Sequence, residues 1–136
     1  MMHWSAQLVG IPYVRRGRDA AGVDCWGLVR LALAPRGIDL PLHGDVDPDD
    51  GKAVAALMAE GAASPDWIPV PTPAEFDVCL FRDGGCDRHV GVVIERGWML
   101  HADRGLGETC LERYDGVRWA NKLIGFYRHR LLGGGA

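Results

Sequence analysis

The chain has 136 residues, of which 48% are hydrophobic and 24% are charged, and its formal net charge is −3. This length and composition indicate one globular domain over residues 1–136. Basic residues form no run longer than the pair Arg15 and Arg16, which argues against nucleic acid as a partner, and no apolar stretch approaches the roughly 18 residues of a membrane span.

The N-terminal segment and the spacing of the cysteines indicate the cellular compartment in which the protein is made. Residues 1–7 lack the basic region and apolar stretch of a secretion signal, so we expect synthesis in the bacterial cytoplasm without a signal peptide and no membrane insertion. The four cysteines lie far apart without CxxC spacing, and we expect no disulfide framework.

The first half of the chain predicts helices and loops. A short helix is expected around residues 4–9, followed by a loop rich in Gly and Pro. Apolar residues then recur at helical intervals over 23–34, with Asp24 as N-cap and Pro35 as the stop, so that Cys25 falls in the first helical turn. A long surface loop over 35–50 and a third helix over 51–60 follow.

The second half predicts strands. β-branched and aromatic runs separated by glycine-containing turns cover residues 76–81, 89–95, 98–103, 109–114 and 123–128. Such a series indicates an antiparallel meander, and helices followed by strands indicate an α+β domain whose helices pack on one face of the sheet. The glycine-rich end, residues 132–136, is expected to be disordered.

A helix-terminal cysteine and a strand histidine suggest nucleophilic catalysis. A thiol attacks as thiolate, and a helix N-terminus together with a neighbouring imidazole would lower the pKa of Cys25. His89 and His101 lie in predicted strands, whereas His3 and His129 lie near the chain ends and His43 lies in a polar loop. We therefore expect His89 and His101 to serve Cys25.

The strand around His89 adds a spatial expectation. Side chains alternate along a strand, so His89 and Gly91 share one face, and Gly91 would leave room for the helix terminus that carries Cys25. His101 follows across a tight turn and would lie on the neighbouring strand. One histidine could then orient the other, which completes a nucleophile, base and orienter.

The segment Asp24-Cys25-Trp26-Gly27-Leu28-Val29 resembles the Asp-Cys-Ser-Gly-Leu-Val signature of NlpC-type papain-like cysteine peptidases. Pro12-Tyr13 precedes it, a His-Val-Gly strand and a further histidine follow, and the similarity extends from about Gly10 to Tyr127. The resemblance implies cleavage of the peptide stem of peptidoglycan without a cofactor. By position it implies that Cys25 is the nucleophile, His89 the base and His101 its orienter, with Tyr13, Asp24 and Trp26 on the oxyanion and substrate side.

Two positions depart from that signature. Trp26 replaces the usual serine, which resembles the version found in cell-wall peptidases of phage tails and gene transfer agents. That subgroup implies phage-like tail or baseplate proteins as partners and a particle that carries the domain to the wall. Phe76 replaces the glycine expected before Asp77, which would affect contacts with the substrate.

Other interpretations stand beside this one. The chain could be a structural tail or baseplate subunit that keeps a peptidase fold, or a papain-like amidase or acyltransferase that acts on another amide. Tyr13 could equally anchor a loop, and His101 could be a hydrogen-bonded core residue. Cys79 and Cys110 are expected to be strand core without a partner.

No metal site is expected. Cys86 and His89 have CxxH spacing, but no second pair of ligands follows. The acidic segment 45–51 superficially resembles a calcium loop but lacks the glycine and glutamate at the required places.

Overall fold

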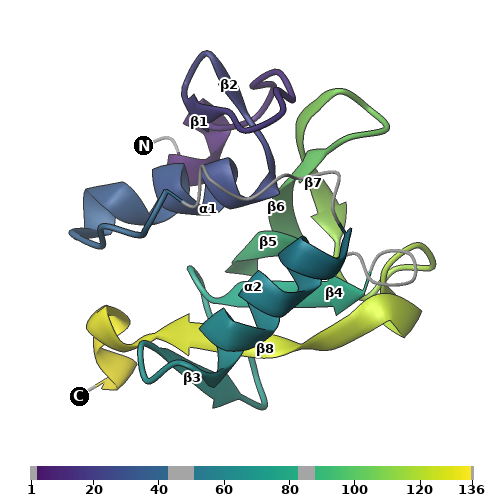
Figure 1. Ribbon diagram of the computed structural model, residues 1–136. Coiled ribbons are helices and arrows are strands. Elements are labelled where there is room, and N and C mark those ends of the chain that lie inside the picture. The colour runs from purple at the N-terminus through teal and green to yellow at the C-terminus, as the bar shows by residue number, and fades with distance from the viewer. Residues whose placement is uncertain (1–2, 43–50, 83–87, 136) are drawn as a thin grey trace.

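The computed structural model describes residues 3–42, 51–82 and 88–135. Two α-helices lie on one face of a six-stranded antiparallel sheet, so the predicted α+β fold is confirmed (Figure 1). None of the helices in these ranges is long and apolar enough to cross a membrane.

The N-terminal half consists mainly of helices and loops, as predicted. Its elements are η1 (Trp4–Gln7), β1 (Arg18–Asp19), β2 (Gly22–Val23), α1 (Cys25–Leu33) and η2 (Ala34–Arg36). The expected helix over 4–9 is a single 3₁₀ turn, and the two-residue strands β1 and β2, which pair with each other, have no clear signal in the sequence. The third predicted helix is present as α2 (Gly51–Ala63).

The start of α1 is held by its own sequence neighbours. The Asp24 carboxylate accepts a hydrogen bond of 2.8 Å from the Gly27 N–H, which caps the helix, and one of 2.6 Å from Arg18. A Cβ atom at Gly27 would overlap the carbonyl oxygen of Gly17. Glycine at this place therefore lets the loop that carries Arg18 lie directly on the first turn of α1.

The sheet contains one more strand than predicted. It consists of β3 (Trp67–Val70), β4 (Val78–Arg82), β5 (Arg88–Glu95), β6 (Trp98–Asp103), β7 (Glu108–Arg113) and β8 (Leu123–His129), in the spatial order β3-β8-β4-β5-β6-β7. The strand β3 went unpredicted because it contains Pro69 and lies half-exposed at an edge of the sheet, which removes the usual apolar pattern.

The expected meander is correct only for β4 to β7. The last strand, β8, does not follow β7 but lies between β3 and β4. Arg128 of β8 makes two hydrogen bonds of 2.8 Å to the fully buried Asp77 just before β4. Phe126 and Tyr127 of β8 pack against the cores on opposite faces of the sheet, which fixes the strand in an interior position.

The two faces of the sheet carry different cores. The face beneath α1 and α2 presents Val78, Leu80, Val90 and Val92 to the helices. The opposite face is covered by the segment after β7, whose Trp119 packs on a cluster of Cys79, Phe81, Val93, Met99 and Tyr114. This second core lies around the candidate histidines.

Phe76 departs from the resemblance for a structural reason. Its φ angle is +73°, in the region that favours glycine. The ring is 5% exposed, stacks on Trp4 with a centroid distance of 4.5 Å, and lies 4.5 Å from the Arg36 guanidinium carbon. Phe76 is a core residue here, and the expected effect on substrate contacts stays a prediction.

The backbone at the glycine-rich end forms a 3₁₀ helix, η4 (Arg130–Gly135). The disorder expected over residues 132–136 stays a prediction. Leu132 packs against the core beneath the helices, and the Leu131 N–H donates to Nδ1 of His129 at 3.2 Å. These contacts hold the start of η4 against β8.

Candidate active site

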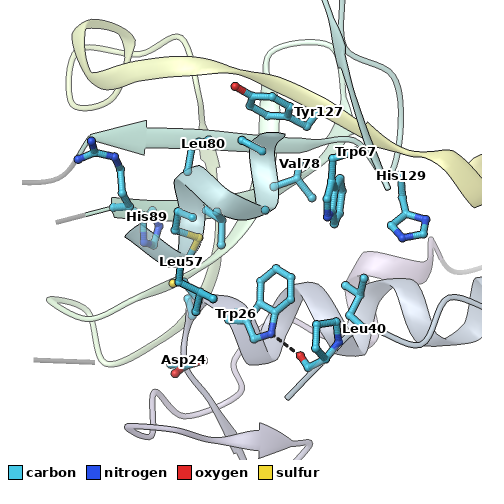
Figure 2. Close-up of a pocket in the computed structure, with 18 of the residues that line it drawn as sticks. Asp24, Trp26, Leu40, Leu57, Trp67, Val78, Leu80, His89, Tyr127 and His129 are labelled. Carbon is cyan, nitrogen blue, oxygen red and sulfur yellow. Dashed lines mark hydrogen bonds between the residues drawn. The ribbon is translucent and has the colours of Figure 1, made fainter. Parts of the chain in front are cut away.

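A cleft of about 520 Å³ lies between the start of α1, α2 and the sheet. Figure 2 shows Trp26 and Leu40 across from Trp67 and Val78, with His89 and Asp24 toward the other end of the cleft. The cleft also contains Tyr13, Cys25 and four arginines, namely Arg18, Arg88, Arg104 and Arg118. Every catalytic or binding residue predicted from the sequence lines it except His101, which lies directly behind His89.

Cys25 is the first residue of α1 and is partly exposed in the cleft. Its thiol takes part in backbone hydrogen bonds with Val90 and Trp26, so the sulfur lies beside the residue that follows His89. No direct hydrogen bond joins the Cys25 sulfur to the His89 ring among the described contacts. Hydrogen bonds of catalytic groups often tighten only when substrate is bound, so the missing contact does not exclude the two residues as nucleophile and base.

The surroundings of the thiol oppose the lowered pKa expected from the sequence. Burial raises the pKa of the Cys25 thiol to about 12, and the adjacent Asp24 carboxylate adds to the rise. The backbone hydrogen bonds and Arg18 act in the opposite direction but are smaller. Attack therefore requires a base that removes the proton as the reaction proceeds.

Three side chains from three adjacent strands form a hydrogen-bonded series. His89 Nε2 lies 2.8 Å from His101 Nδ1, and His101 Nε2 lies 2.8 Å from Glu112 Oε1. Glu112 Oε1 also accepts the indole N–H of Trp119 at 2.9 Å and a hydrogen bond of 3.2 Å from Arg118. The predicted pair of histidines is thus present, with a carboxylate behind it.

This series fixes the position of each proton. An ionised carboxylate only accepts hydrogen bonds, so His101 carries its proton on Nε2. In a neutral ring His101 Nδ1 is then the acceptor, and His89 must donate from Nε2. The lone pair of His89 therefore lies on Nδ1. Glu112 thus sets the tautomer of both rings.

Both imidazoles are neutral near pH 7. Burial lowers the pKa of His89 to about 3, and the proximity of His101 contributes further. Burial also lowers the pKa of His101, although Glu112 opposes the change. Trp119 stacks on the His89 ring at a centroid distance of 4.9 Å and an angle of 17°, which keeps water from that face.

The three residues assigned to the oxyanion and substrate side have distinct places. Tyr13 lines the cleft, and its backbone N–H donates to the Gly107 carbonyl at 2.8 Å. Asp24 lines the cleft too, but one carboxylate oxygen is engaged in capping α1 and in the ion pair with Arg18. Trp26 lines the cleft, and its indole N–H donates to the Pro41 carbonyl at 2.7 Å.

Some expectations about single residues are wrong. A Cβ at Gly91 would meet Met99 and the Cβ of His101 rather than α1, so this glycine gives room to the second core and not to Cys25. Cys79 is fully buried, as predicted, but Cys110 is partly exposed and its sulfur lies 3.6 Å from His101 Nε2.

Other functional residues were missed. His129, set aside as terminal, lines the cleft, because β8 turns back into the sheet. Glu112 and Trp119 carry no motif, and the only signal for Glu112 is its alternation with Cys110 on the strand paired to His101. His43, Cys86 and the acidic segment 45–50 lie outside the described residues.

Comparisons with known proteins agree with this geometry. The model of the NlpC/P60 family matches residues 10–128. Among solved structures, an NlpC/P60 family protein from Bacillus cereus ATCC 10987 superposes with a TM-score of 0.64 at 20% identity, and the match covers 90% of this chain and 36% of that protein. No curated protein gives a significant match.

Two further solved structures have the same fold. The NlpC/P60 domain of the peptidoglycan hydrolase SagA gives a TM-score of 0.59 at 22% identity, with 90% of both chains covered. The peptidoglycan hydrolase RipB from Mycobacterium tuberculosis gives 0.58 at 22% identity, with 92% of this chain and 60% of RipB covered. Because the family model spans nearly all of the sequence, and the cleft brings together the cysteine and histidines of the signature, the chain belongs to the NlpC/P60 family.

Proposed function

We propose that the protein is a cysteine peptidase that cleaves the peptide stem of bacterial peptidoglycan. The observation that carries the proposal is the series from Glu112 through His101 to His89, which leaves the unprotonated Nδ1 of His89 in the cleft that holds Cys25. Two proteins of the same fold, SagA and RipB, are described as peptidoglycan hydrolases, which supports the substrate class.

The chemistry follows from the neutral resting pair. His89 Nδ1 takes the thiol proton as the Cys25 sulfur attacks the carbonyl carbon of the scissile amide. The imidazolium is stabilised through His101 by the Glu112 carboxylate and then donates the proton to the leaving amine. Water, activated by the same nitrogen, hydrolyses the thioester and restores the thiol. The Cys25 N–H at the start of α1, together with Tyr13, would hold the oxyanion.

The cleft offers cationic groups to a substrate that carries carboxylates. Arg18, Arg88, Arg104 and Arg118 line it together with acidic side chains, and Arg18 and Arg118 are already paired with Asp24 and Asp103. Stem peptides with γ-linked D-glutamate retain free carboxylates beside the scissile bond, and guanidinium groups bind carboxylates in two-point hydrogen bonds. The aromatic end, formed by Trp26, Trp67 and Tyr127, would contact the apolar parts of the peptide.

The test is direct. Purified protein is incubated with peptidoglycan sacculi, and released fragments are identified by mass spectrometry, with Cys25→Ala protein as the matched control. We expect new amino termini within the stem peptide for the wild type alone. Sacculi that remain intact, or equal release by the Cys25→Ala protein, would contradict the proposal.

We further infer that the peptidase belongs to a phage-like tail or gene transfer agent particle. The support is Trp26 in place of serine, a residue whose indole ties the segment after η2 to the first turn of α1. In this setting the partners are tail or baseplate proteins, and the particle brings the domain to the wall. The protein should co-purify with such particles from the bacterium that encodes it, and its absence from particles that contain other tail proteins would refute the setting.

A further inference from the structure

Behind the catalytic histidine, the ladder of β6 and β7 presents four metal-binding groups on one face. His101 pairs with Cys110 in the register, and Asp103 and Glu112 lie two residues further along their respective strands. Because side chains alternate along a strand, alternate positions on two paired strands all point to the same side. His101 and Asp103 of β6 therefore face the same space as Cys110 and Glu112 of β7.

The distances suit a small metal ion. One ligand atom from each of the four residues lies within 4.8 Å of the others. His101 Nε2 lies 2.8 Å from Glu112 Oε1 and 3.6 Å from the Cys110 sulfur. Tetrahedral Zn²⁺ with bonds of about 2.0–2.3 Å places its ligand atoms roughly 3.3–3.8 Å apart. Shifts of a fraction of an ångström to about one ångström would complete such a site.

The donors also match Zn²⁺ in kind. The set contains one nitrogen, one sulfur and two carboxylates, which are the ligand types that Zn²⁺ takes in proteins. Hard ions such as Mg²⁺ and Ca²⁺ would require oxygen ligands throughout. The second nitrogen of His101 already has a hydrogen-bond partner in His89, as the ring of a zinc-bound histidine normally does.

A cation already contacts both carboxylates. Arg118 makes hydrogen bonds of 2.7 and 3.1 Å to Asp103 and one of 3.2 Å to Glu112. Its side chain is 48% exposed, so it can turn toward solvent when a metal ion replaces it. Trp119 donates to Glu112 Oε1 and would keep that bond if the other carboxylate oxygen bound the metal.

We propose that His101, Asp103, Cys110 and Glu112 form a Zn²⁺ site whose occupation switches off the peptidase. Binding of the metal itself is independent of the proposed function, whereas the inhibition rests on it. Coordination deprotonates the Cys110 thiol and releases that one proton to solvent. It also requires the lone pair of His101 Nε2, so the proton of that ring moves to Nδ1.

The change of tautomer in His101 also changes the tautomer of His89. With a proton on His101 Nδ1, the nitrogen that faces it, His89 Nε2, becomes the acceptor, and the single proton of His89 moves to Nδ1. That nitrogen can then no longer take the proton of Cys25. Zn²⁺ behind the histidines would thus reverse the tautomer that Glu112 sets, without contacting the nucleophile.

Cobalt provides a readout that does not depend on activity. Co²⁺ is added to Cys25→Ala protein, which removes the nucleophile as a competing ligand, and the thiolate-to-cobalt charge-transfer band is recorded. We expect the band in Cys25→Ala protein and its loss in the Cys25→Ala/Cys110→Ala double variant. A band that survives the loss of Cys110, or no band in either protein, would overturn the site.

Activity on sacculi tests the consequence. We expect Zn²⁺ to inhibit the wild type, and Cys110→Ala to act normally without metal but to need at least about tenfold more Zn²⁺ for half inhibition. Arg118→Ala should bind the metal more tightly in the cobalt assay, since it removes the competing cation. If the protein binds cobalt and is active but is not inhibited by Zn²⁺, the proposed inhibition is wrong. If the metal-free protein has no activity on sacculi, the proposed function is wrong, but the cobalt result on the metal site still stands.

Discussion

The two sides of the cleft are built in different ways. The nucleophile side is local, since Gly17, Arg18, Asp24 and Gly27 hold the start of α1 through contacts between residues at most ten positions apart. The base side consists of His89, His101 and Glu112 on β5, β6 and β7, and their contacts depend on the register of these strands. Local contacts can be predicted from a sequence motif, whereas contacts that depend on register become visible only in the folded sheet.

Replacement of the nucleophile separates chemistry from folding on the local side. Cys25→Ala should lower activity on sacculi by about three orders of magnitude or more, because no other group can form the thioester. The melting temperature should hardly change. The matched control is Cys79→Ala, which removes a fully buried sulfur from the second core. The Cys79→Ala variant should keep its activity and lose about 1 kcal/mol of stability. Lost activity in Cys79→Ala with retained activity in Cys25→Ala would show that Cys79 is the nucleophile.

Replacement of the orienting groups tests the register-dependent side. His101→Ala should reduce kcat by about 100-fold, since His89 loses the partner that fixes its tautomer. Glu112→Gln keeps the shape but removes the charge, and we expect a loss of about tenfold. Single-turnover kinetics would measure both. Full activity in Glu112→Gln would show that His101 keeps its tautomer without a carboxylate.

Acid should lower the stability of the folded protein through the buried His89 ring. The pKa of His89 in the folded protein is about 3, below its ordinary value of 6.5, so the unfolded chain binds the proton first as the pH falls. This contribution to stability is fully present above pH 6.5 and is lost as the pH falls toward 3. At pH 5 the loss is about 2 kcal/mol from His89 alone.

Urea unfolding at pH 7 and pH 5 would measure this effect. His89→Gln removes the titrating group, so the difference between the two pH values should shrink in that variant. Val117→Ala, which changes a fully exposed side chain without a titrating group, serves as the control and should leave the difference as it is. Equal differences in the wild type and His89→Gln would contradict the burial of a neutral ring.

Removal of one charge gives the smallest effect. Asp24→Asn keeps a good N-cap but weakens the largely buried ion pair with Arg18, so the protein should lose about 1 kcal/mol of stability. The nearby carboxylate raises the pKa of Cys25, and without it the alkylation of Cys25 by iodoacetamide should begin at lower pH. Asp24→Ala should shift the pH profile of Cys25 alkylation in the same way, but it should be about 1 kcal/mol less stable than Asp24→Asn because it also loses the N-cap. An unchanged alkylation profile would mean that burial alone sets this pKa.

The sequence therefore allowed part of the molecule to be predicted. The cap at Asp24, the position of Cys25 and the pairing of His89 with His101 follow from alternation and local motifs. Glu112 could not be found that way, because its role depends on a diagonal contact across β6 and β7.

The pKa of Cys25 and the position of β8 in the sheet could not be predicted from the sequence either. The first depends on how much solvent the folded chain excludes from the sulfur, which no local pattern records. The second depends on a bidentate ion pair between residues 51 positions apart, Asp77 and Arg128.

The interior position of β8 has a consequence for biosynthesis. Residues 123–129 complete the sheet between β3 and β4, which both precede them by more than 40 positions. On the ribosome, β3 and the wall of the cleft that it supports cannot reach their final pairing until β8 has emerged. Nascent chains arrested before residue 123 should thus remain open to proteolysis around β3. The wall of the cleft that contains Trp67, Tyr127 and His129 should therefore be completed late in translation.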